Sequence, residues 1–435
     1  MKNYLPKINR VPIIEKIKFS YPIEHLYKQF SQSLNTAFLH SSLKSDSGRY
    51  SFIGIAPFII LTAKNSISNL KIKNHKITLK RPVFDCLKSI LDSYQISCPE
   101  NIPLAGGGIG YFSYDLKNSI ENFQKKAKND LNLPEMYFVF YQALIIQDNL
   151  APEELYISVL DPQSHNLSSA THLMKTIKNT ISSYRPNSLP DQQIVKAGSK
   201  FILKSNFSKK NYIRILEKAI NYIYAGDIYQ VCLSQRFQTK SPLTPFRLYQ
   251  KLNKINPAPF SAFLNFAPCK IISSSPELFL KVNKDTLETR PMKGTRPRGK
   301  NKNEDKFYKT DLQMNDKETA ELSMIVDLLR NDIGKISVPG SVEVTEHRRI
   351  ETYPTVFQTI SIIRGKIAQE ISLIDAIKAA FPGGSISGCP KIRAMEIIEE
   401  LEPIARGIYT GAIGYISFHN TMTLNMAIRT MIMKK

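Results

Sequence analysis

A lysine lies in a short segment bounded by proline and glycine, Pro291-Met292-Lys293-Gly294-Thr295. Proline and glycine are typical of turns, and such a segment has little structural need for a long charged side chain. A lysine amine is a nucleophile only when it is neutral. Because its reference pKa is about 10.4, an enclosing pocket must disfavour the charged form. Lys293 is therefore a candidate nucleophile, and the ordinary alternative is a surface lysine in a turn.

Acidic residues flank this lysine on both sides. Glu277 directly follows Pro276, sixteen positions before Lys293, where a carboxylic acid could protonate a leaving hydroxyl. Glu318 and Glu321 are three positions apart on a predicted helix, so both carboxylates share one face and could bind Mg²⁺. Taken alone, Glu277 could equally be an exposed carboxylate at a strand end, and paired glutamates more often lie on a solvated helix face.

A glycine-rich segment follows further along the chain, in Phe381-Pro382-Gly383-Gly384-Ser385-Ile386-Ser387-Gly388-Cys389-Pro390-Lys391. Pro390 suits the first turn of a helix that runs to Pro403. A glycine loop that enters a helix presents free N–H groups and the positive end of the helix dipole to an anion. Lys391 adds a positive charge at the same place.

The elements that must position these residues can be outlined. Residues 1 to about 150 alternate short β-type runs with turn signals, which predicts an antiparallel sheet with a few helices. The stretch Tyr184 to Lys200 is the best linker candidate, because it is proline-rich and lacks apolar periodicity. After it, a helix is predicted from an N-cap at Ser208 to a stop at Gly226, and a buried strand is predicted from Ile228 to Phe237.

Bulk properties indicate a globular chain. Of its 435 residues, 42% are hydrophobic and 22% are charged, and the longest apolar run, Ile53 to Ala63, is too short to span a bilayer. We expect a cytoplasmic protein without membrane contact. The net charge of +22 raises the possibility of nucleic-acid binding. Because the basic residues are spread along the chain without a recognition motif, we expect no nucleic-acid partner.

Together and in this order, the motifs resemble the chorismate-utilising enzymes. The lysine in a Pro-x-Lys-Gly-Thr string is similar to the aminodeoxychorismate synthase component I branch, where anthranilate synthase large subunits usually carry alanine. The resemblance extends from Leu39 to Arg429. It implies an α+β fold in which two large antiparallel β-sheets pack face to face with helices outside. It also implies an amino-terminal region, residues 1–185, and a chorismate-binding catalytic region, residues 200–435.

The resemblance implies a transferase reaction with a covalent lysine intermediate. Lys293 attacks the chorismate ring while Glu277 acts as acid/base, and ammonia then displaces the lysine to give 4-amino-4-deoxychorismate, a step toward 4-aminobenzoate and folate. Water-using relatives carry a lysine where Gln230 stands, so ammonia is the expected acceptor. The chain lacks a Gly-x-Cys-x-Gly elbow that could make ammonia from glutamine. A separate glutamine amidotransferase subunit is therefore the expected partner, in a heterodimer.

The resemblance also assigns binding residues. Glu318 and Glu321 are the implied Mg²⁺ ligands. The implied substrate-binding residues are Thr295, Gly384, Ser385, Lys391, Tyr409 and Arg429. A second group resembles a pocket that encloses tryptophan in some members, although a core contact between the two halves is nearly as good an interpretation. This group consists of Ser41, Ser47, Gly48, Arg49, Tyr50, Pro259, Phe260 and Ser261.

Two departures from the family pattern bear on the interpretation. Gln358 stands where many relatives place a histidine, which weakens an anthranilate synthase assignment more than an aminodeoxychorismate synthase assignment. The chain ends at Lys435, where the family continues with a glycine-rich loop and a helix bearing two more Mg²⁺-binding glutamates, so the catalytic region is expected to be cut short. The alternatives are an anthranilate synthase component I and a catalytically impaired binding subunit.

Overall fold

The structure is a computed structural model that describes residues 4–98, 102–163, 169–186 and 202–434. The strands are β1 Ile13–Lys18, β2 Thr36–His40, β3 Tyr50–Lys64, β4 Ile67–Ile72, β5 His75–Leu79, β6 Gly107–Phe112, β7 Met136–Asp148, β8 Glu154–Val159, β9 Lys204–Ser205, β10 Gln230–Val231, β11 Phe237–Gln238, β12 Phe260–Asn265, β13 Lys270–Ser275, β14 Leu278–Asn283, β15 Thr286–Arg290, β16 Met292–Pro297, β17 Glu343–Thr352, β18 Val356–Lys366, β19 Gly388–Cys389, β20 Ala412–Ser417, β21 Met422–Met426 and β22 Thr430–Met433. The helices are α1 Ile23–Lys28, α2 Val83–Ser93, α3 Ala170–Ser182, α4 Lys209–Tyr224, α5 Pro245–Ile255, α6 Lys302–Met314, α7 Asp316–Gly334, α8 Leu373–Ala380 and α9 Lys391–Leu401, with 3₁₀ turns η2 Tyr114–Ser119 and η3 Gly384–Ile386.

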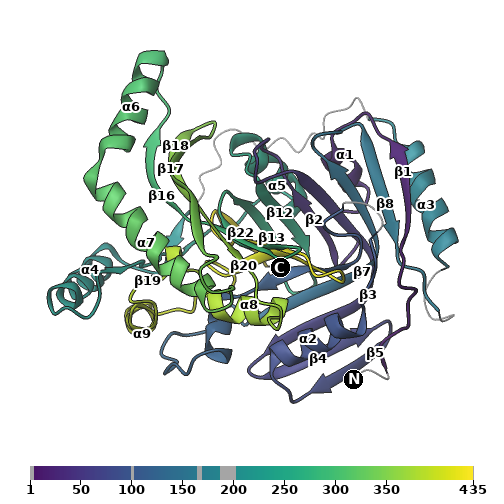
Figure 1. Ribbon diagram of the computed structural model, residues 1–435, viewed down its shortest axis with the longest axis horizontal. Helices are drawn as coiled ribbons and strands as arrows, with labels where there is room; N and C mark the ends of the chain where they lie inside the picture. The colour runs from purple at the N-terminus through teal and green to yellow at the C-terminus, as the bar shows by residue number, and fades with distance from the viewer. Residues whose placement is uncertain (1–3, 99–101, 164–168, 187–201, 435) are drawn as a thin grey trace.

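Nearly all the described strands join in one closed antiparallel network, and only the short pairs β10–β19 and β9–β11 stand apart. The helices lie outside this network (Figure 1). The predicted α+β fold with large antiparallel sheets and outer helices is therefore confirmed. Its two sheets are not separate, because hydrogen-bonded pairing continues from one to the other.

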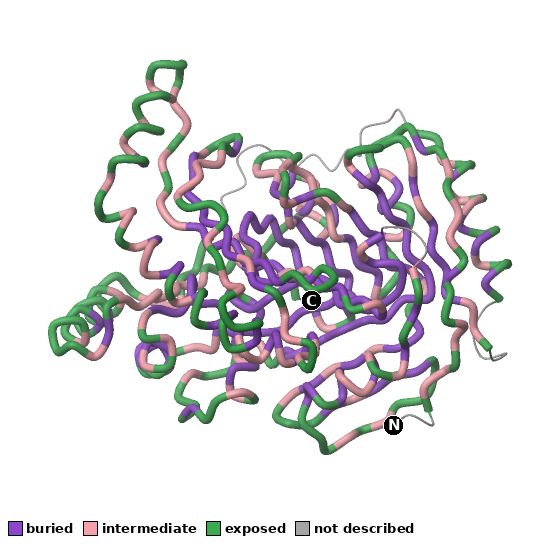
Figure 2. The backbone as a smooth tube through the Cα atoms, viewed as in Figure 1, coloured by how far each residue is buried: buried purple, intermediate pink, exposed green. Residues whose placement is uncertain are grey.

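The long central strands explain why the sheet is buried. All thirteen residues of β7 are buried, and β7 pairs with β3 along most of its length. A strand covered on both faces carries a nearly continuous apolar run instead of an alternating one. Figure 2 shows the buried backbone concentrated in the middle of the molecule, over these strands and their neighbours.

The two halves of the chain share this network. β2 pairs with β12, and β6 pairs with β20, so strands from before residue 185 are hydrogen-bonded directly to strands from after residue 200. Close approach is essential in β6, where a Cβ at Gly110 would lie 2.1 Å from the carbonyl oxygen of Tyr137. The division into residues 1–185 and 200–435 stays a prediction, and the expected linker falls largely on residues 187–201, outside the described part of the chain.

Helices cover the network on several sides (Figure 1). α3 packs against β8, and α5 packs against β13. α6 and α7 both pack against β16 and β18, the strands that carry the candidate nucleophile and Gln358. This contact positions the acidic residues of α7 beside Lys293.

The predicted helix after the linker is confirmed, but the strand that follows it is not. α4 begins after Ser208, whose hydroxyl accepts a hydrogen bond from the Asn211 amide, and Gly226 follows with φ +79°. Only Gln230–Val231 and Phe237–Gln238 of the predicted buried strand are β-structure. The segment lies apart from the main sheet, and its apolar residues pack onto α4 and α9 instead.

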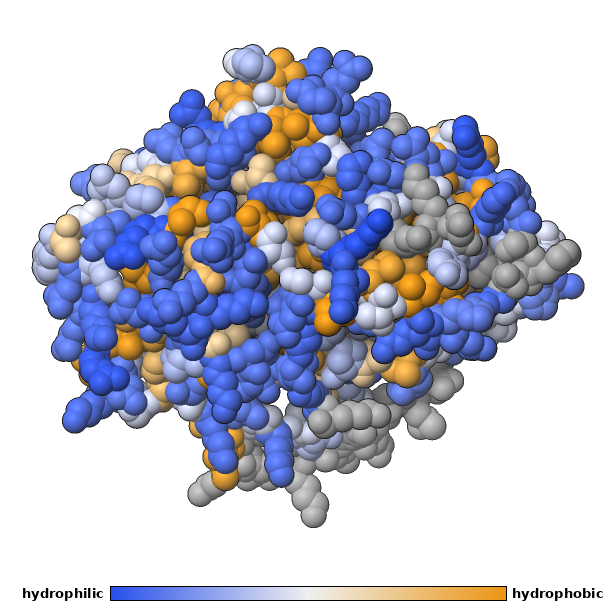
Figure 3. Space-filling model, turned by 90° about the horizontal axis from the view of Figure 1, so that it is seen from below, coloured by the Kyte–Doolittle hydropathy of each residue, from blue (hydrophilic) through white to orange (hydrophobic). Residues whose placement is uncertain are grey.

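The surface and the helices have the polar character that the composition predicts. Figure 3 shows a face on which hydrophilic residues predominate and apolar patches are scattered. Within the described ranges, no helix combines the length and apolar character needed to cross a bilayer.

Candidate active site

Lys293 is aimed by an irregularity in its strand. The pairing of β16 with β18 shifts register between Lys293 and Thr295, and Gly294 between them has φ +75°. A bulge of this kind bends a strand and redirects a side chain, and glycine adopts positive φ without strain. The Pro/Gly-bounded segment is therefore a strand with a bulge rather than an exposed turn, and the Lys293 side chain is only 14% exposed.

Lys293 faces α7. Its Nζ lies 2.8 Å from Oε1 of Glu321, and the same oxygen accepts a hydrogen bond of 2.5 Å from Nε2 of Gln230. Burial favours the neutral amine, but Cys232, Glu321 and Glu277 together outweigh burial and raise the pKa of Lys293 above its ordinary value. Lys293 is therefore an ammonium ion in this structure, held by the acidic residue opposite it.

Glu277 is a buried carboxyl group next to the lysine. It lies between β13 and β14 and accepts a hydrogen bond of 2.5 Å from the hydroxyl of Ser385. Burial raises its pKa to about 7, although Ser385, Lys293 and Arg429 act in the opposite direction. A carboxyl group that is half protonated near neutral pH can serve as a general acid, so the alternative of an exposed strand-end carboxylate does not hold.

Gln358 connects two of the predicted substrate-binding residues. Its Nε2 donates to Oγ1 of Thr295 over 3.2 Å, and its Oε1 accepts from Nη2 of Arg429 over 3.1 Å. Arg429 also contributes to the charge felt by Glu277. The structure therefore brings Thr295 and Arg429 together with the Glu277 and Lys293 side chains, although they are far apart in the sequence.

The two predicted metal ligands are each paired with a cation. Glu318 accepts from Nη1 of Arg296 over 3.2 Å, while Glu321 contacts Lys293. Across the described residues, no group of three or more His, Cys, Asp or Glu side chains converges. Mg²⁺ commonly uses one or two protein carboxylates and completes its shell with water and substrate. The pair on α7 fits that donor requirement, provided that the two cations release the carboxylates.

In the glycine-rich segment, Ser385 contacts a residue of the site, whereas Lys391 points away from it. Gly384 and Ser385 form the turn η3, and Ser385 reaches Glu277. Nζ of Lys391 instead lies 2.5 Å from Oδ2 of Asp332 and donates to the carbonyl oxygens of Ala380 and Pro382. Lys391 holds the segment against α7 in this structure, and its contact with substrate stays a prediction.

Tyr409 lies near Arg406, Glu402 and Cys232 and is 37% exposed. Burial raises the pKa of its hydroxyl, and nearby Arg406 acts in the opposite direction. Arg406 is itself buried and pairs with Glu402 over 2.7 Å. Tyr409 therefore remains a neutral hydroxyl that a substrate could reach.

Sequence reasoning missed several neighbours of the site. Asp332 pairs with Lys391, Arg296 pairs with Glu318, and Cys232 influences Lys293. The signal for Asp332 was available, because it stands on the same predicted helix as Glu321. The other two contacts depend on strand bulges and irregular segments, which local sequence patterns do not reveal.

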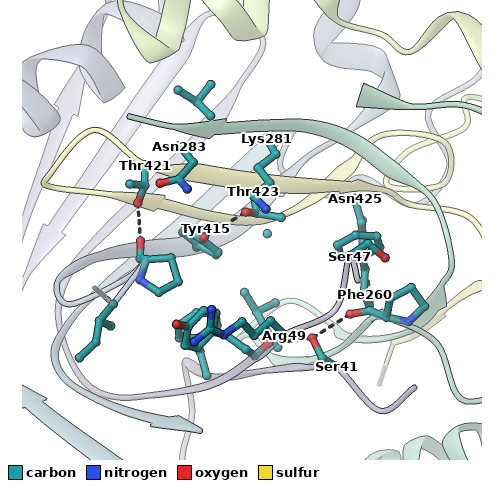
Figure 4. Close-up of a pocket in the computed structure, with 18 of the residues that line it drawn as sticks. Ser41, Ser47, Arg49, Phe260, Lys281, Asn283, Tyr415, Thr421, Thr423 and Asn425 are labelled. Carbon is teal, nitrogen blue, oxygen red and sulfur yellow. Dashed lines mark hydrogen bonds between the residues drawn. The ribbon is translucent and has the colours of Figure 1, made fainter. Parts of the chain in front are cut away.

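A separate cavity of about 790 Å³ gathers most of the predicted tryptophan-site residues (Figure 4). Ser41 donates to the carbonyl oxygens of Tyr50 and Pro259, which ties the two halves of the chain together at the cavity. Of the predicted group, the cavity is lined by Ser41, Ser47, Arg49, Tyr50, Pro259, Phe260 and Ser261. Gly48 packs behind it against Pro259, so both the pocket and the core-contact interpretation describe part of what is seen.

Known proteins resemble the whole chain. The chorismate binding enzyme family matches residues 38–435. Anthranilate synthase component 1 of Acetivibrio thermocellus is 36% identical over 94% of this chain and 84% of its own length. Aminodeoxychorismate synthase component 1 of Bacillus subtilis (strain 168) is 34% identical over 97% of this chain and 89% of its own length.

Solved structures show the same fold. The crystal structure of anthranilate synthase component I from Streptococcus pneumoniae TIGR4 has a TM-score of 0.77 at 32% identity, covering 90% of this chain and 86% of that one. The menaquinone-specific isochorismate synthase from Escherichia coli has a TM-score of 0.68 at 14% identity, covering 98% and 88%, and agrees in fold alone. With its sequence matched from residue 38 to the end and its fold shared, this chain belongs to the chorismate binding enzyme family.

Proposed function

We propose that the protein is the component I of an aminodeoxychorismate synthase, which converts chorismate and ammonia to 4-amino-4-deoxychorismate. The observation that carries the proposal is the placement of Lys293 and Glu277 in one site. Lys293 is aimed by the Gly294 bulge, and Glu277 is a buried acid whose pKa is about 7. An amine nucleophile and a protonated carboxyl group are the two groups that displacement of a ring hydroxyl requires.

In the proposed reaction, the neutral Lys293 amine forms a bond to the chorismate ring carbon as the ring hydroxyl departs with a proton from Glu277. Ammonia then displaces the lysine, which leaves as the free amine. Arg429 binds a substrate carboxylate in this proposal, and its hydrogen bond to Gln358 supports that role. Thr295, Ser385 and Tyr409 offer hydroxyl groups for further substrate contacts.

The ion pair between Lys293 and Glu321 has to open for this chemistry, since an ammonium ion is not a nucleophile. Glu318 and Glu321 would hold Mg²⁺, which would supply positive charge for a substrate carboxylate. Lys293 has to leave Glu321 and release its proton before it attacks the ring.

Ammonia as the acceptor is supported at Gln230. Its Nε2 is bonded to Glu321, while its Oε1 is buried and has no hydrogen-bond partner among the described residues. A neutral amide cannot take a proton from water as a lysine at this position could, which favours ammonia over water as the nucleophile. The chain carries no Gly-x-Cys-x-Gly elbow, so we propose that a separate glutamine amidotransferase subunit delivers the ammonia.

Anthranilate synthase component I is the second candidate, because relatives of both activities are similarly close, at 36% and 34% identity. The discriminating experiment is to identify the product that purified protein forms from chorismate, Mg²⁺ and an ammonium salt. We expect 4-amino-4-deoxychorismate without pyruvate release. Anthranilate with pyruvate would establish the second candidate, and unconsumed chorismate with correctly folded protein would indicate a binding subunit.

A further inference from the structure

A buried arginine, Arg406, lies in the segment between α9 and β20, and its side chain is 2% exposed. Its Nε and Nη2 donate to the two carboxylate oxygens of Glu402 over 2.9 and 2.7 Å. The guanidinium group also donates to the carbonyl oxygens of Ile386 and Cys232 and to Oγ1 of Thr410. These contacts use every N–H group that an arginine side chain has, so no donor is left for a ligand.

The acceptor on the glycine-rich segment stands next to the hydrogen-bond partner of the buried acid. Ile386 directly follows Ser385 in the short turn η3, and the Ser385 hydroxyl donates to Glu277. The bond of 3.0 Å from Arg406 to the Ile386 carbonyl oxygen holds the end of this turn. The position of the Ser385 hydroxyl therefore depends on the arginine.

The other two acceptors also adjoin residues of the candidate active site. Cys232 stands two positions after Gln230 of β10, which belongs to a two-stranded sheet with β19 and not to the main network. Thr410 directly follows Tyr409 and has φ +59°, a conformation that is unfavourable for a β-branched residue. Arg406 thus holds two segments that the main sheet does not hold at these residues.

The ion pair with Glu402 makes this arrangement rigid. Glu402 is 3% exposed, and its Oε1 also accepts from the Ser234 amide over 2.7 Å. The Arg406 guanidinium group lies over the ring of Tyr114, 4.6 Å from its centre. Because the guanidinium group is a planar fork with fixed donor directions, a lysine cannot reproduce these contacts.

We propose that Arg406 is a positioning residue of the proposed reaction. Its guanidinium group fixes the segments that carry Ser385, Gln230 and Tyr409 relative to one another. Arg406 does not contact the substrate itself, because its side chain is buried and its donors are occupied. The inference rests on the proposed function, since it assigns Arg406 a role in chorismate turnover at that site.

The hydrogen bond between Ser385 and Glu277 gives this role a specific signature. Burial raises the pKa of Glu277 to about 7, and Ser385 is the largest of three groups that act in the opposite direction, before Lys293 and Arg429. Turnover needs protonated Glu277 and neutral Lys293, so kcat/KM should rise with pH up to the pKa of Glu277 and then level off. A Ser385 hydroxyl that moves away would move this break to higher pH.

Arg406→Lys keeps the charge that balances Glu402 but has three donors in place of five. In assays with chorismate, Mg²⁺ and an ammonium salt, we expect chorismate consumption to slow by roughly 10- to 100-fold and the break to lie at higher pH than in the wild type. Ser385→Ala should move the break in the same direction. In Arg406→Lys/Ser385→Ala the break should stay where Ser385→Ala puts it, because the arginine acts on Glu277 through Ser385.

Arg393→Lys is the matched control. Arg393 stands on α9 and pairs with Asp227 and Glu396, outside the site, so its variant should keep the wild-type rate and pH profile. Circular dichroism verifies folding. If Arg406→Lys does not fold, the variant Glu402→Gln/Arg406→Gln, which leaves neither charge unpaired, takes its place with the same expected results.

Hydrogen exchange tests the positioning without turnover. The amides of Cys232, Ser387 and Thr410 are each hydrogen-bonded, one in each segment that Arg406 joins. In folded Arg406→Lys all three should exchange at least about tenfold faster, while Arg393→Lys exchanges as the wild type does.

Wild-type turnover with an unchanged pH break in folded Arg406→Lys would overturn the proposal. A break in Arg406→Lys/Ser385→Ala that lies beyond that of Ser385→Ala alone would also overturn it. If the wild-type protein consumes no chorismate, the proposed function fails, and hydrogen exchange then decides whether Arg406 fixes the three segments. Faster exchange in all three supports that role, and faster exchange in one segment or in none contradicts it.

Discussion

The candidate active site and the separate cavity differ in whether their lysine forms an ion pair. In the active site two cations face acids: Lys293 contacts Glu321, and Arg296 contacts Glu318. In the cavity, Lys281 forms no ion pair among the described residues, and Glu288, its register partner on β15, is held by Arg290 and Arg364. Both regions are built on the same antiparallel network, so the difference lies in the side chains and not in the fold.

The difference decides whether an ion pair has to open before each lysine can act. If Lys293 is the nucleophile of the proposed reaction, its ion pair with Glu321 has to open before it can react. Lys281 in the cavity has no such pair to open, and burial lowers its pKa. The two regions therefore differ in whether an ion pair must open before the lysine can make a new contact.

The largest test of this comparison is Lys293→Met. If Lys293 is the nucleophile, we expect formation of 4-amino-4-deoxychorismate to fall by roughly 10³-fold or more, as on loss of a covalent catalyst. Intact mass spectrometry of wild-type protein with chorismate and no ammonia should show a covalent adduct that maps to Lys293. Lys306→Met, at an exposed lysine of α6, is the control and should keep full activity. Turnover by Lys293→Met near the wild-type rate would refute a covalent role.

Glu277→Gln removes the buried acid while keeping its shape. We expect a rate loss of about 10²-fold or more, the usual contribution of general acid catalysis. The reaction requires protonated Glu277 and neutral Lys293 at the same time. Because the pKa of Glu277 is about 7 and that of Lys293 is raised above its ordinary value, wild-type kcat/KM should rise with pH up to about 7 and level off above it. A pH profile of kcat/KM checks this: the break near pH 7 should be absent from Glu277→Gln, and a break that persists in the variant would mean that another group titrates there.

The same variant should change stability in the opposite direction. A folded-state pKa raised above the unfolded value gives stability that is complete at pH 4 and is lost as the pH rises through 7. Glu277→Gln lacks this loss, so at pH 8 its free energy of unfolding should exceed that of the wild type by as much as about 3 kcal/mol. Denaturant unfolding at pH 5 and pH 8 measures the difference, and a wild-type advantage that grows with pH would contradict it.

Sequence reasoning located best those residues whose position depends on their close neighbours in the chain. The Ser-Pro-Glu turn placed Glu277, and the spacing of Glu318 and Glu321 placed both on one face of α7. The antiparallel fold followed from the resemblance, and the helix beginning after Ser208 followed from its cap. Each of these depends on neighbours within a few residues or on a motif read as a unit.

The remainder depends on contacts between distant segments. Nothing near Lys391 indicates that Asp332 and two carbonyl oxygens engage it, and nothing near Lys281 indicates that Arg290 and Arg364 occupy the acid beside it. A lysine between buried strand residues was a visible signal, but its meaning required the cavity. Pairings across the sheet are set by the whole fold, so local patterns do not predict them.

Glu321→Gln tests the link between the metal and the lysine. Its amide is a poorer ligand for Mg²⁺, and we expect Mg²⁺ affinity to fall at least about tenfold by calorimetry. Loss of the carboxylate should also lower the pKa of Lys293 and raise its reactivity toward an acylating reagent. Asp327→Asn is the control, because Asp327 lies on the same helix but is 73% exposed and pairs with Arg330. If both variants bind Mg²⁺ equally well, Glu321 is not a metal ligand.

The smallest expected effect concerns the bulge that aims Lys293. Gly294 has φ +75°, and a Cβ there would lie 2.9 Å from both Cδ1 of Leu312 and Oγ1 of Thr359. Gly294→Ala should therefore lower the free energy of unfolding by roughly 1–3 kcal/mol and reduce turnover as Lys293 is misdirected. Gly334→Ala is the matched control: it ends α7, has no heavy atom within 4 Å of its added Cβ, and should be neutral or stabilising by roughly 0.5–1 kcal/mol. Equal stability of the two variants would mean that the bulge relaxes freely, and the aim of Lys293 would then have to come from Glu321 alone.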